Sequence, residues 1–254
     1  WFISMESHKL RSKALKAIDE TIFYPSKGKE RLKSMIETRP DWCVSRQRVW
    51  GVPLPIFLNK KTNKILVDDE VFENIAKIYE KEGSDCWFSD DPQRFLGKKY
   101  KAEDFEKLSD IVEVWFDSGS THSFVLEKRK DLKWPASMYL EGSDQHRGWF
   151  HSSLLESCGT RGRAPFESIL SHGFVVDGKG LKMSKSLGNV ISPEDILKKY
   201  GADILRIWVA SSNYAEDLRI DYSILDQHAE SYRKIRNTFR YLLGNLNDNI
   251  EQIN

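Results

Sequence analysis

The clearest fold signal in the chain is Ser137-Met138-Tyr139-Leu140-Glu141-Gly142-Ser143-Asp144-Gln145-His146-Arg147-Gly148-Trp149-Phe150. Its first four residues predict a short strand, and the apolar residues from Trp149 onward predict a helix. In the turn between them, Gly142 lets a ligand approach the backbone, and Asp144 can accept hydrogen bonds from sugar hydroxyls. The helix N-terminus also attracts negative groups. An ordinary helix cap uses the same residue types, so the turn alone leaves both interpretations open.

Two further runs in this part of the chain have strand character. Residues 111–116 read Ile-Val-Glu-Val-Trp-Phe and end at Asp117-Ser118-Gly119-Ser120, and residues 168–176 form a third run. Strands that alternate with helical crossovers predict a parallel α/β sheet, whose ligands bind beyond the carboxyl ends of its strands. The predicted ends are residues 115–118, 141–145 and 172–174.

Three helices are predicted within the first hundred residues. Residues 4–39 contain two helical patterns, which Pro25 separates and Pro40 closes. A further helix begins at a cap, Asp68 or Asp69, and ends at Gly83. The polar residues 84–109 are predicted to be a loop or linker.

Three more helices are predicted near the end of the chain. The first begins at the cap Ser192-Pro193 and ends at Gly201, the second holds residues 204–209, and the third covers about residues 222–243. The last helix carries a basic cluster, Arg233, Lys234, Arg236 and Arg240. The cluster can bind nucleic-acid phosphates or form a solvated face.

Composition excludes several classes of protein. With 254 residues and 40% hydrophobic content, the chain is neither disordered nor a mini-protein. No apolar stretch approaches the roughly 20 residues of a membrane span, and the first residues lack a signal-peptide pattern. Cys43, Cys86 and Cys158 form no C-x-x-C pair, so they predict neither a disulfide framework nor a zinc site. A reducing, cytoplasmic setting fits best.

Charge is balanced overall but uneven along the chain. A net charge of +1 argues against a generally basic surface and allows local basic patches. Residues 4–39 hold nine Lys and Arg against five acids, which suits a solvated helix face or a nucleic-acid contact. Residues 42–51 interleave Trp with Arg, which suits base stacking or half-buried strands equally.

A glycine-flanked loop, residues 177–189, follows the third strand run and contains Lys182-Met183-Ser184-Lys185-Ser186. Its two lysines can bring compact positive charge to a polyphosphate and stabilise the charge on departing pyrophosphate. Lysines on such a loop can also simply be solvated.

This five-residue order resembles KMSKS, the signature loop of the class I aminoacyl-tRNA synthetases. The resemblance implies that Lys185 contacts the ATP phosphates with help from Lys182. It places Met183, Ser184 and Ser186 in the same ATP-binding loop.

Three other segments resemble the same family. The sequence YLEGSDQHRGWF at residues 139–150 is similar to the isoleucyl form of the family's turn, which implies an aminoacyl-adenylate site at Glu141, Gly142, Asp144 and Gln145. VWFDSG at residues 114–119 resembles a strand end of the family and implies that Trp115 and Trp149 form an isoleucine pocket. Core packing would explain both tryptophans without that motif. HGF at residues 172–174 resembles the adenine-side strand end, which places His172 and Phe174 near ATP.

The resemblance covers nearly all 254 residues and implies their organisation. The expected α/β fold is the second half of a Rossmann-like parallel-sheet catalytic domain, with an α+β connective module before it and α-helical stem-contact and anticodon-side helices after it. The expected boundaries are a connective segment re-entering the catalytic domain at 1–109, the second half of the nucleotide-binding catalytic domain at 110–191, stem-contact helices at 192–221 and the start of a helical anticodon-binding domain at 222–254.

The implied activity is ATP-dependent activation of isoleucine to isoleucyl-adenylate and transfer to tRNA(Ile). The enzyme is expected to be cytoplasmic and monomeric as a full enzyme, with Mg²⁺ accompanying ATP and no dedicated metal site. A leucyl or valyl enzyme and an inactive tRNA-binding piece stay open as alternatives.

The family also has a histidine-rich HIGH element in the first half of its sheet. The six histidines of this chain include no H-x-G-H, and the chain opens at Trp1 without Met. We therefore expect an internal or C-terminal-side piece of a larger enzyme, inactive alone.

Overall fold

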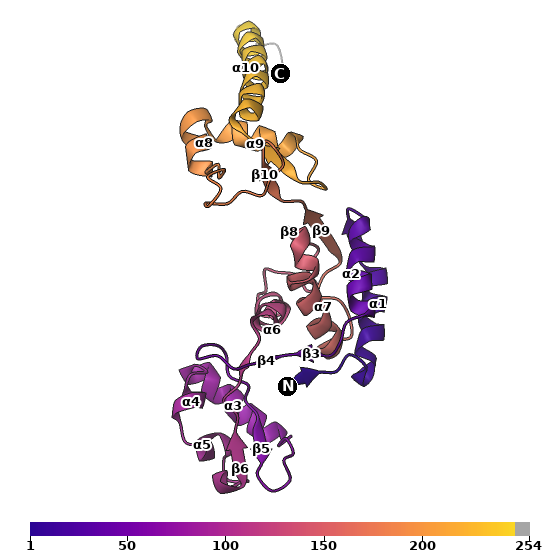
Figure 1. Ribbon diagram of the computed structural model, residues 1–254, viewed down its shortest axis with the longest axis vertical. Coiled ribbons are helices and arrows are strands. Elements are labelled where there is room, and N and C mark those ends of the chain that lie inside the picture. Colours follow the sequence, from indigo (N-terminus) through magenta and orange to yellow (C-terminus); the bar gives the residue numbers. More distant parts are fainter. Residues whose placement is uncertain (247–254) are drawn as a thin grey trace. The chain divides into compact units, whose positions relative to one another are not determined.

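The structure is a computed structural model that describes residues 1–246, and the chain divides into two compact units (Figure 1). The first unit is Trp1–Tyr139 with Asp144–Ile169, and the second is Leu140–Ser143 with the chain from Leu170 onward. Helices and strands occur in both units, and strands pair in parallel, so the predicted α/β class is confirmed. No helix within residues 1–246 is both long and apolar enough to cross a bilayer.

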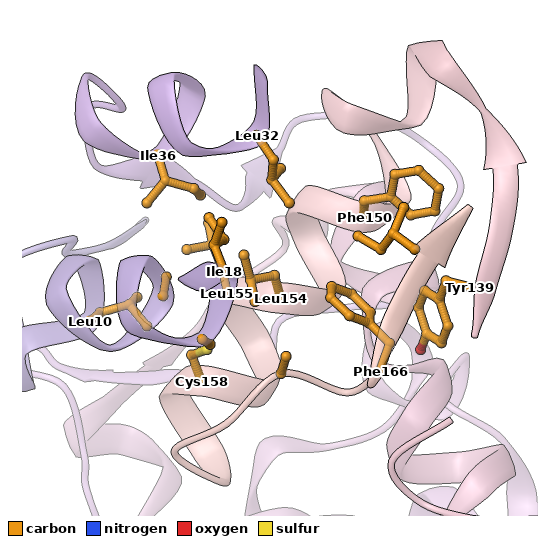
Figure 2. Packing of buried hydrophobic residues seen from close by; sticks show 14 of the residues in the cluster. Leu10, Ile18, Leu32, Ile36, Tyr139, Phe150, Leu154, Leu155, Cys158 and Phe166 are labelled. Carbon is orange, nitrogen blue, oxygen red and sulfur yellow. The ribbon is translucent and has the colours of Figure 1, made fainter. Parts of the chain in front are cut away.

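Three helices enclose the main core of the first unit, namely α1 (Leu10–Glu20), α2 (Lys27–Glu37) and α7 (Trp149–Thr160). The buried positions of α1 and α2 recur every three or four residues, as predicted for the two helices before Pro40. Figure 2 shows their side chains meeting those of α7, which is buried along nearly its whole length. Arg11 donates to the carbonyl oxygens of Ile36 at 2.6 Å, Glu37 at 3.1 Å and Arg39 at 2.9 Å, and so satisfies the C-terminal end of α2.

Short strands join these helices. A three-stranded sheet has the order β2-β9-β8, formed by β2 (Ile22–Tyr24), β9 (Ser168–His172) and β8 (Tyr139–Gly142). A parallel bridge between Ala136 and Phe166 lies just before β8 and β9. Three antiparallel pairs complete the strands of the first unit, β1 (Phe2–Ile3) with β3 (Trp42–Cys43), β4 (Ser45–Arg46) with β7 (Ile111–Val112), and β5 (Phe57–Asn59) with β6 (Phe105–Lys107).

Residues 57–105 have a hydrophobic cluster of their own. The predicted helix is α3 (Asp69–Glu82), capped by Asp68, whose carboxylate accepts from the backbone N–H of Glu70 and Val71, and ended by Gly83. The prediction of a loop over residues 84–109 is wrong. This segment forms α4 (Cys86–Ser89), α5 (Pro92–Leu96) and β6, and it buries Trp87, Phe95 and Phe105 in one core. Elements of three to five residues are too short to show a period in the sequence, so only the packing reveals them.

Residues 111–116 are also not one strand. The strand stops at Val112, and Val114–Gly119 forms the helix α6. A Cβ on Gly119 would lie 3.0 Å from the backbone of Ser152, so the glycine lets α6 pack directly on α7. This close packing overrides the strand propensity of Val114 and Trp115.

The run 168–176 is likewise two strands, β9 and β10 (Val175–Asp177), rather than one. The break falls at Gly173, where a Cβ would lie 2.2 Å from the carbonyl oxygen of Glu216. The chain must therefore pass too close to a neighbouring loop for a regular strand to continue.

The second unit is largely helical around one parallel strand pair. β10 pairs with β11 (Leu218–Ile220), and the predicted helices are α8 (Pro193–Tyr200), α9 (Ala202–Ser211) and α10 (Tyr222–Leu246). Ser192 caps α8 through a 3.2 Å contact with the Glu194 N–H, and Gly201 ends that helix with a φ of 82°. Ile196, Trp208, Ile220 and Leu225 meet in the core of this unit.

Candidate functional site

The turn after β8 holds Asp144 and Gln145 in fixed positions in the first unit. The side-chain oxygen of Gln145 accepts the backbone N–H of Trp149 at 2.9 Å and so caps the N-terminus of α7. The side-chain amide of Gln145 donates to Asp144 at 3.1 Å. A Cβ on Gly148 would lie 2.4 Å from the capping oxygen, so a side chain there would disturb the cap. Gln145 therefore both starts the helix and orients the Asp144 carboxylate.

Trp115 and Trp149, the predicted walls of an isoleucine pocket, lie at this same turn. The Trp115 ring lies over Gly148, since a Cβ there would be 2.9 Å from it, and Trp115 is 40% exposed. The Trp149 indole instead donates to the carbonyl oxygen of Ser118 at 2.9 Å and stacks on Tyr139, with ring centroids 3.9 Å apart. Trp115 thus offers an open ring face, whereas Trp149 belongs partly to the core. The pocket itself stays a prediction.

A cavity of about 270 Å³ opens beside Trp115, and its wall holds three arginines and two acids, Asp41 and Glu113. Its wall includes Arg39, Arg46, Arg147, Glu113, Trp115 and His151. Arg46 lies 3.7 Å from the buried Glu113 carboxylate. Burial lowers the pKa of His151 to about 3, so its imidazole is neutral at pH 7.

No sequence pattern predicts a site role for Arg147 or His151, whereas Arg39 and Arg46 belong to basic segments that suit nucleic-acid contact among other interpretations. The available signal was position alone, because Arg147 and His151 flank Trp149 in the turn. Residues 42–51 suit half-buried strands or base stacking by their sequence. In the structure Trp42 and Arg46 belong to short strands, whereas Trp50 is 89% exposed.

The signature loop lies in the second unit, between β10 and α8. Its lysines, Lys182 and Lys185, are both exposed and make no ion pair among the residues that the structure describes. Met183 packs against the core of this unit, and the hydroxyl oxygens of Ser184 and Ser186 lie 3.1 Å apart. The loop therefore has an anchored apolar residue and two free cationic side chains, which suits an anionic ligand.

His172 and Phe174 flank the glycine between β9 and β10. Nδ1 of His172 donates to the carbonyl oxygen of Gly173 at 2.8 Å, which orients the ring locally. The backbone N–H of Phe174 donates to Asp217 at 2.8 Å, and Phe174 is 49% exposed. Both side chains are accessible at a strand end, and their predicted contact with ATP stays a prediction.

Glu141 and Gly142 complete the predicted adenylate-binding set. They end β8 and group with the second unit, whereas Asp144 and Gln145 group with the first. The structure thus describes two pairs of these residues, each within its own unit. Glu141 is exposed and Gly142 is buried.

The capped turn after β8 and the lysine-bearing loop after β10 belong to an α/β protein, and the order of these two segments resembles that of a class I synthetase. A family model described as "tRNA synthetases class I (I, L, M and V)" matches residues 1–221, and the chain belongs to this family.

Within this family, the chain is most informatively compared with isoleucine–tRNA ligases. The chain is 87% identical over 253 residues to an isoleucine–tRNA ligase of Pelagibacter ubique (strain HTCC1062), covering 100% of this chain and 28% of that protein. It is 57% identical over 252 residues to the isoleucine–tRNA ligase of Brucella abortus biovar 1 (strain 9-941), covering 97% and 26%. The chain therefore spans about a quarter of the length of these relatives.

Solved structures share the fold at lower identity. A leucyl-tRNA synthetase of Agrobacterium radiobacter K84, in a ternary complex with tRNA and LeuAMS, superposes with a TM-score of 0.58 at 21% identity, covering 82% of this chain and 29% of that one. A Mycobacterium tuberculosis methionyl-tRNA synthetase in complex with methionyl-adenylate gives 0.55 at 18% identity, covering 88% and 35%.

Proposed function

We propose that this chain is part of an isoleucine–tRNA ligase, which activates isoleucine with ATP and transfers it to tRNA(Ile). The observation that carries the proposal is the 87% identity over the whole chain to an isoleucine–tRNA ligase. The isoleucyl form of the turn at residues 139–150 and the Lys182–Lys185 loop support it.

In the proposed first step, a carboxylate oxygen of isoleucine attacks the α-phosphorus of ATP. A new P–O bond forms isoleucyl-adenylate, and the bond to the bridging oxygen breaks to release pyrophosphate. Lys185, with Lys182, stabilises the charge on the departing pyrophosphate, and Asp144 accepts from the ribose. The exposed ring of Trp115 packs against the aliphatic side chain, with Trp149 behind the turn. The protein contributes position and charge rather than a covalent nucleophile.

The proposed partners are ATP with Mg²⁺, isoleucine and tRNA(Ile), in a cytoplasmic enzyme that is monomeric when complete. Mg²⁺ would neutralise phosphate charge when bound with ATP. Within residues 1–246, no group of three or more His, Cys, Asp or Glu side chains is placed to hold a metal ion, so we assign it no protein ligand.

The test is ATP–pyrophosphate exchange by the full-length protein with a panel of amino acids. We expect exchange with isoleucine to exceed exchange with leucine and clearly exceed exchange with valine. A preference for leucine or valine would assign the protein to another branch of the family. tRNA binding without any exchange would favour a tRNA-binding role instead.

The role of the loop is tested by Lys185→Ala. Because this lysine is proposed to act on the leaving pyrophosphate, we expect exchange to slow by about 100-fold while isoleucine affinity changes little. Lys179→Ala is the matched control, since Lys179 is an exposed lysine of the same glycine-flanked loop outside the signature residues. An unchanged exchange rate in Lys185→Ala would remove this role.

A further inference from the structure

The signature loop is closed at its base by two side chains that the sequence analysis did not single out. Asp177 ends β10, and Asn189 follows the loop twelve residues later. The Asn189 amide donates to Oδ2 of Asp177 at 2.9 Å. The two sides of the loop are therefore joined by one hydrogen bond between side chains.

Asp177 uses its other carboxylate oxygen to shape the near side of the loop. Oδ1 accepts the backbone N–H of Lys179 at 3.0 Å and that of Leu181 at 2.8 Å. The backbone N–H of Asp177 donates in turn to the Leu181 carbonyl oxygen at 2.9 Å. These bonds make residues 177–181 a tight turn that leads directly into the signature residues.

Asn189 binds the signature residues themselves through their backbone. Its amide oxygen accepts the N–H of Ser184 at 2.9 Å, and its amide nitrogen also lies 3.3 Å from the carbonyl oxygen of Lys182. The contacted carbonyl group belongs to Lys182 itself, and Ser184, which donates the contacted N–H, directly precedes Lys185. The Asn189 side chain thus fixes the path of the backbone between the two lysines and leaves both ammonium groups free.

The base of this loop is itself tied to the fold. β10 pairs with β11, and a Cβ on Gly178 would lie 2.0 Å from Oδ2 of Asp221, so the turn lies against that carboxylate. Asp221 accepts the Ile224 N–H at 2.7 Å at the start of α10. A displacement of the loop base is therefore resisted by the strand pair and by the packing at Asp221.

We propose that Asp177 and Asn189 are positioning residues whose hydrogen bond latches the signature loop and places Lys185 for adenylate formation. This proposal rests on the proposed function. Neither side chain needs to touch substrate, because the latch acts through the backbone of residues 182–184. The hydrogen bond from Asn189 also lowers the pKa of Asp177, which keeps the acceptor ionised at neutral pH.

The central test is a reciprocal exchange of the two residues in the full-length protein. Asn189→Asp sets one carboxylate against another and removes both amide donors, so we expect adenylate formation to slow by tenfold or more. The double variant Asp177→Asn with Asn189→Asp restores an amide-to-carboxylate bond and keeps an acceptor for Ser184. It replaces the 3.3 Å donor contact to the Lys182 carbonyl oxygen by an unfavourable approach of two oxygens, so we expect it to recover most but not all of the lost rate.

Two comparisons separate positioning from general damage. Transfer of isoleucine from preformed enzyme-bound adenylate to tRNA should stay within twofold of wild type, since that step releases no pyrophosphate. When Asn189→Asp is combined with Lys185→Ala, it should lower the rate of adenylate formation little further, because both changes act through the Lys185 ammonium group. Asn213→Asp is the matched control, since within residues 1–246 that side chain only accepts the Ala215 N–H, and an aspartate can still do so.

A second readout does not depend on activity. Lys182 and Lys185 are exposed trypsin sites, so we expect Asn189→Asp to be cut there several-fold faster and the double variant to regain wild-type resistance. If the protein catalyses no exchange, the proposed function fails while cleavage still measures the latch. The latch is overturned if Asn189→Asp keeps the wild-type exchange rate and the wild-type rate of trypsin cleavage. It is also overturned if the double variant recovers neither rate.

Discussion

Glu156 is the clearest case of a single residue whose surroundings set its chemistry. It is 8% exposed, and its Oε1 lies against Gly119 without a hydrogen-bond partner among the described residues. Burial, reinforced by the negative charges of Asp117 and Glu113, raises its pKa from 4.5 to about 9. The side chain is therefore protonated in the folded protein at neutral pH.

This raised pKa predicts how stability depends on pH. Between about pH 4.5 and 9 the folded state holds a proton on Glu156 that the unfolded state has lost, so the free energy of unfolding falls as pH rises. The fall is at most about 1.4 kcal/mol per pH unit. Glu156→Gln removes this proton linkage, so its advantage over wild type should grow between pH 5.5 and pH 8 in urea unfolding. The exposed Glu73→Gln should show no such trend, and a constant difference for Glu156→Gln would contradict the assignment.

At the turn after β8, residue identity predicts which side chains lie close together. It does not predict which hydrogen bonds and ring contacts each of them makes. Gln145 was expected to line the adenylate, and in the structure it caps α7 and contacts Asp144. Trp149 is predicted to wall an isoleucine pocket with Trp115, and in the structure one face of its ring stacks on Tyr139. A motif fixes which residues lie close in sequence, whereas ring stacking and capping depend on residues that it does not contain.

At the scale of elements, the sequence predicts best those helices whose ends are marked by a capping residue. Asp68, Gly83, Ser192 and Gly201 each mark an end that the structure confirms, because capping needs only the residue and its near neighbours. The helix α6 and the break between β9 and β10 were missed. Both depend on contacts at Gly119 and Gly173 with segments distant in sequence, which no local pattern records.

The cap of α8 gives a prediction at this scale. Ser192 accepts the Glu194 N–H, and α8 holds Ile196 in the core of the second unit. Ser192→Ala should lower the stability of this unit by about 1 kcal/mol, because the Glu194 N–H loses its side-chain acceptor. Ser192→Asp keeps an acceptor and adds a favourable charge at the helix N-terminus, so its urea midpoint should stay at or above that of wild type. Equal midpoints for the Ala and Asp variants would show that the cap contributes nothing.

For the whole molecule, a net charge of +1 leaves local clusters as the source of any attraction to RNA. On α10, Arg233, Arg236 and Arg240 follow a spacing of three and four residues and share one face of the helix. Arg233 is paired with Glu230 at 2.7 Å. Arg236 and Arg240 are exposed and make no ion pair within residues 1–246, so their charge is the part of the cluster available to phosphate.

These two arginines predict the salt dependence of the proposed tRNA binding by the full-length protein. Each phosphate contact releases counterions, so the slope of log affinity against log salt should become shallower by about 1 for each arginine removed. Arg236→Ala and Arg240→Ala should therefore weaken binding at low salt and converge with wild type at high salt. Arg129→Ala should leave the slope unchanged, since Arg129 is held by Asp131 at 2.6 Å in the other unit. A wild-type slope in the Arg236→Ala/Arg240→Ala double variant would show that the cluster is a solvated face, the alternative that its sequence pattern leaves open. The basic residues of α1 and α2 would then be the next candidates for the RNA contact.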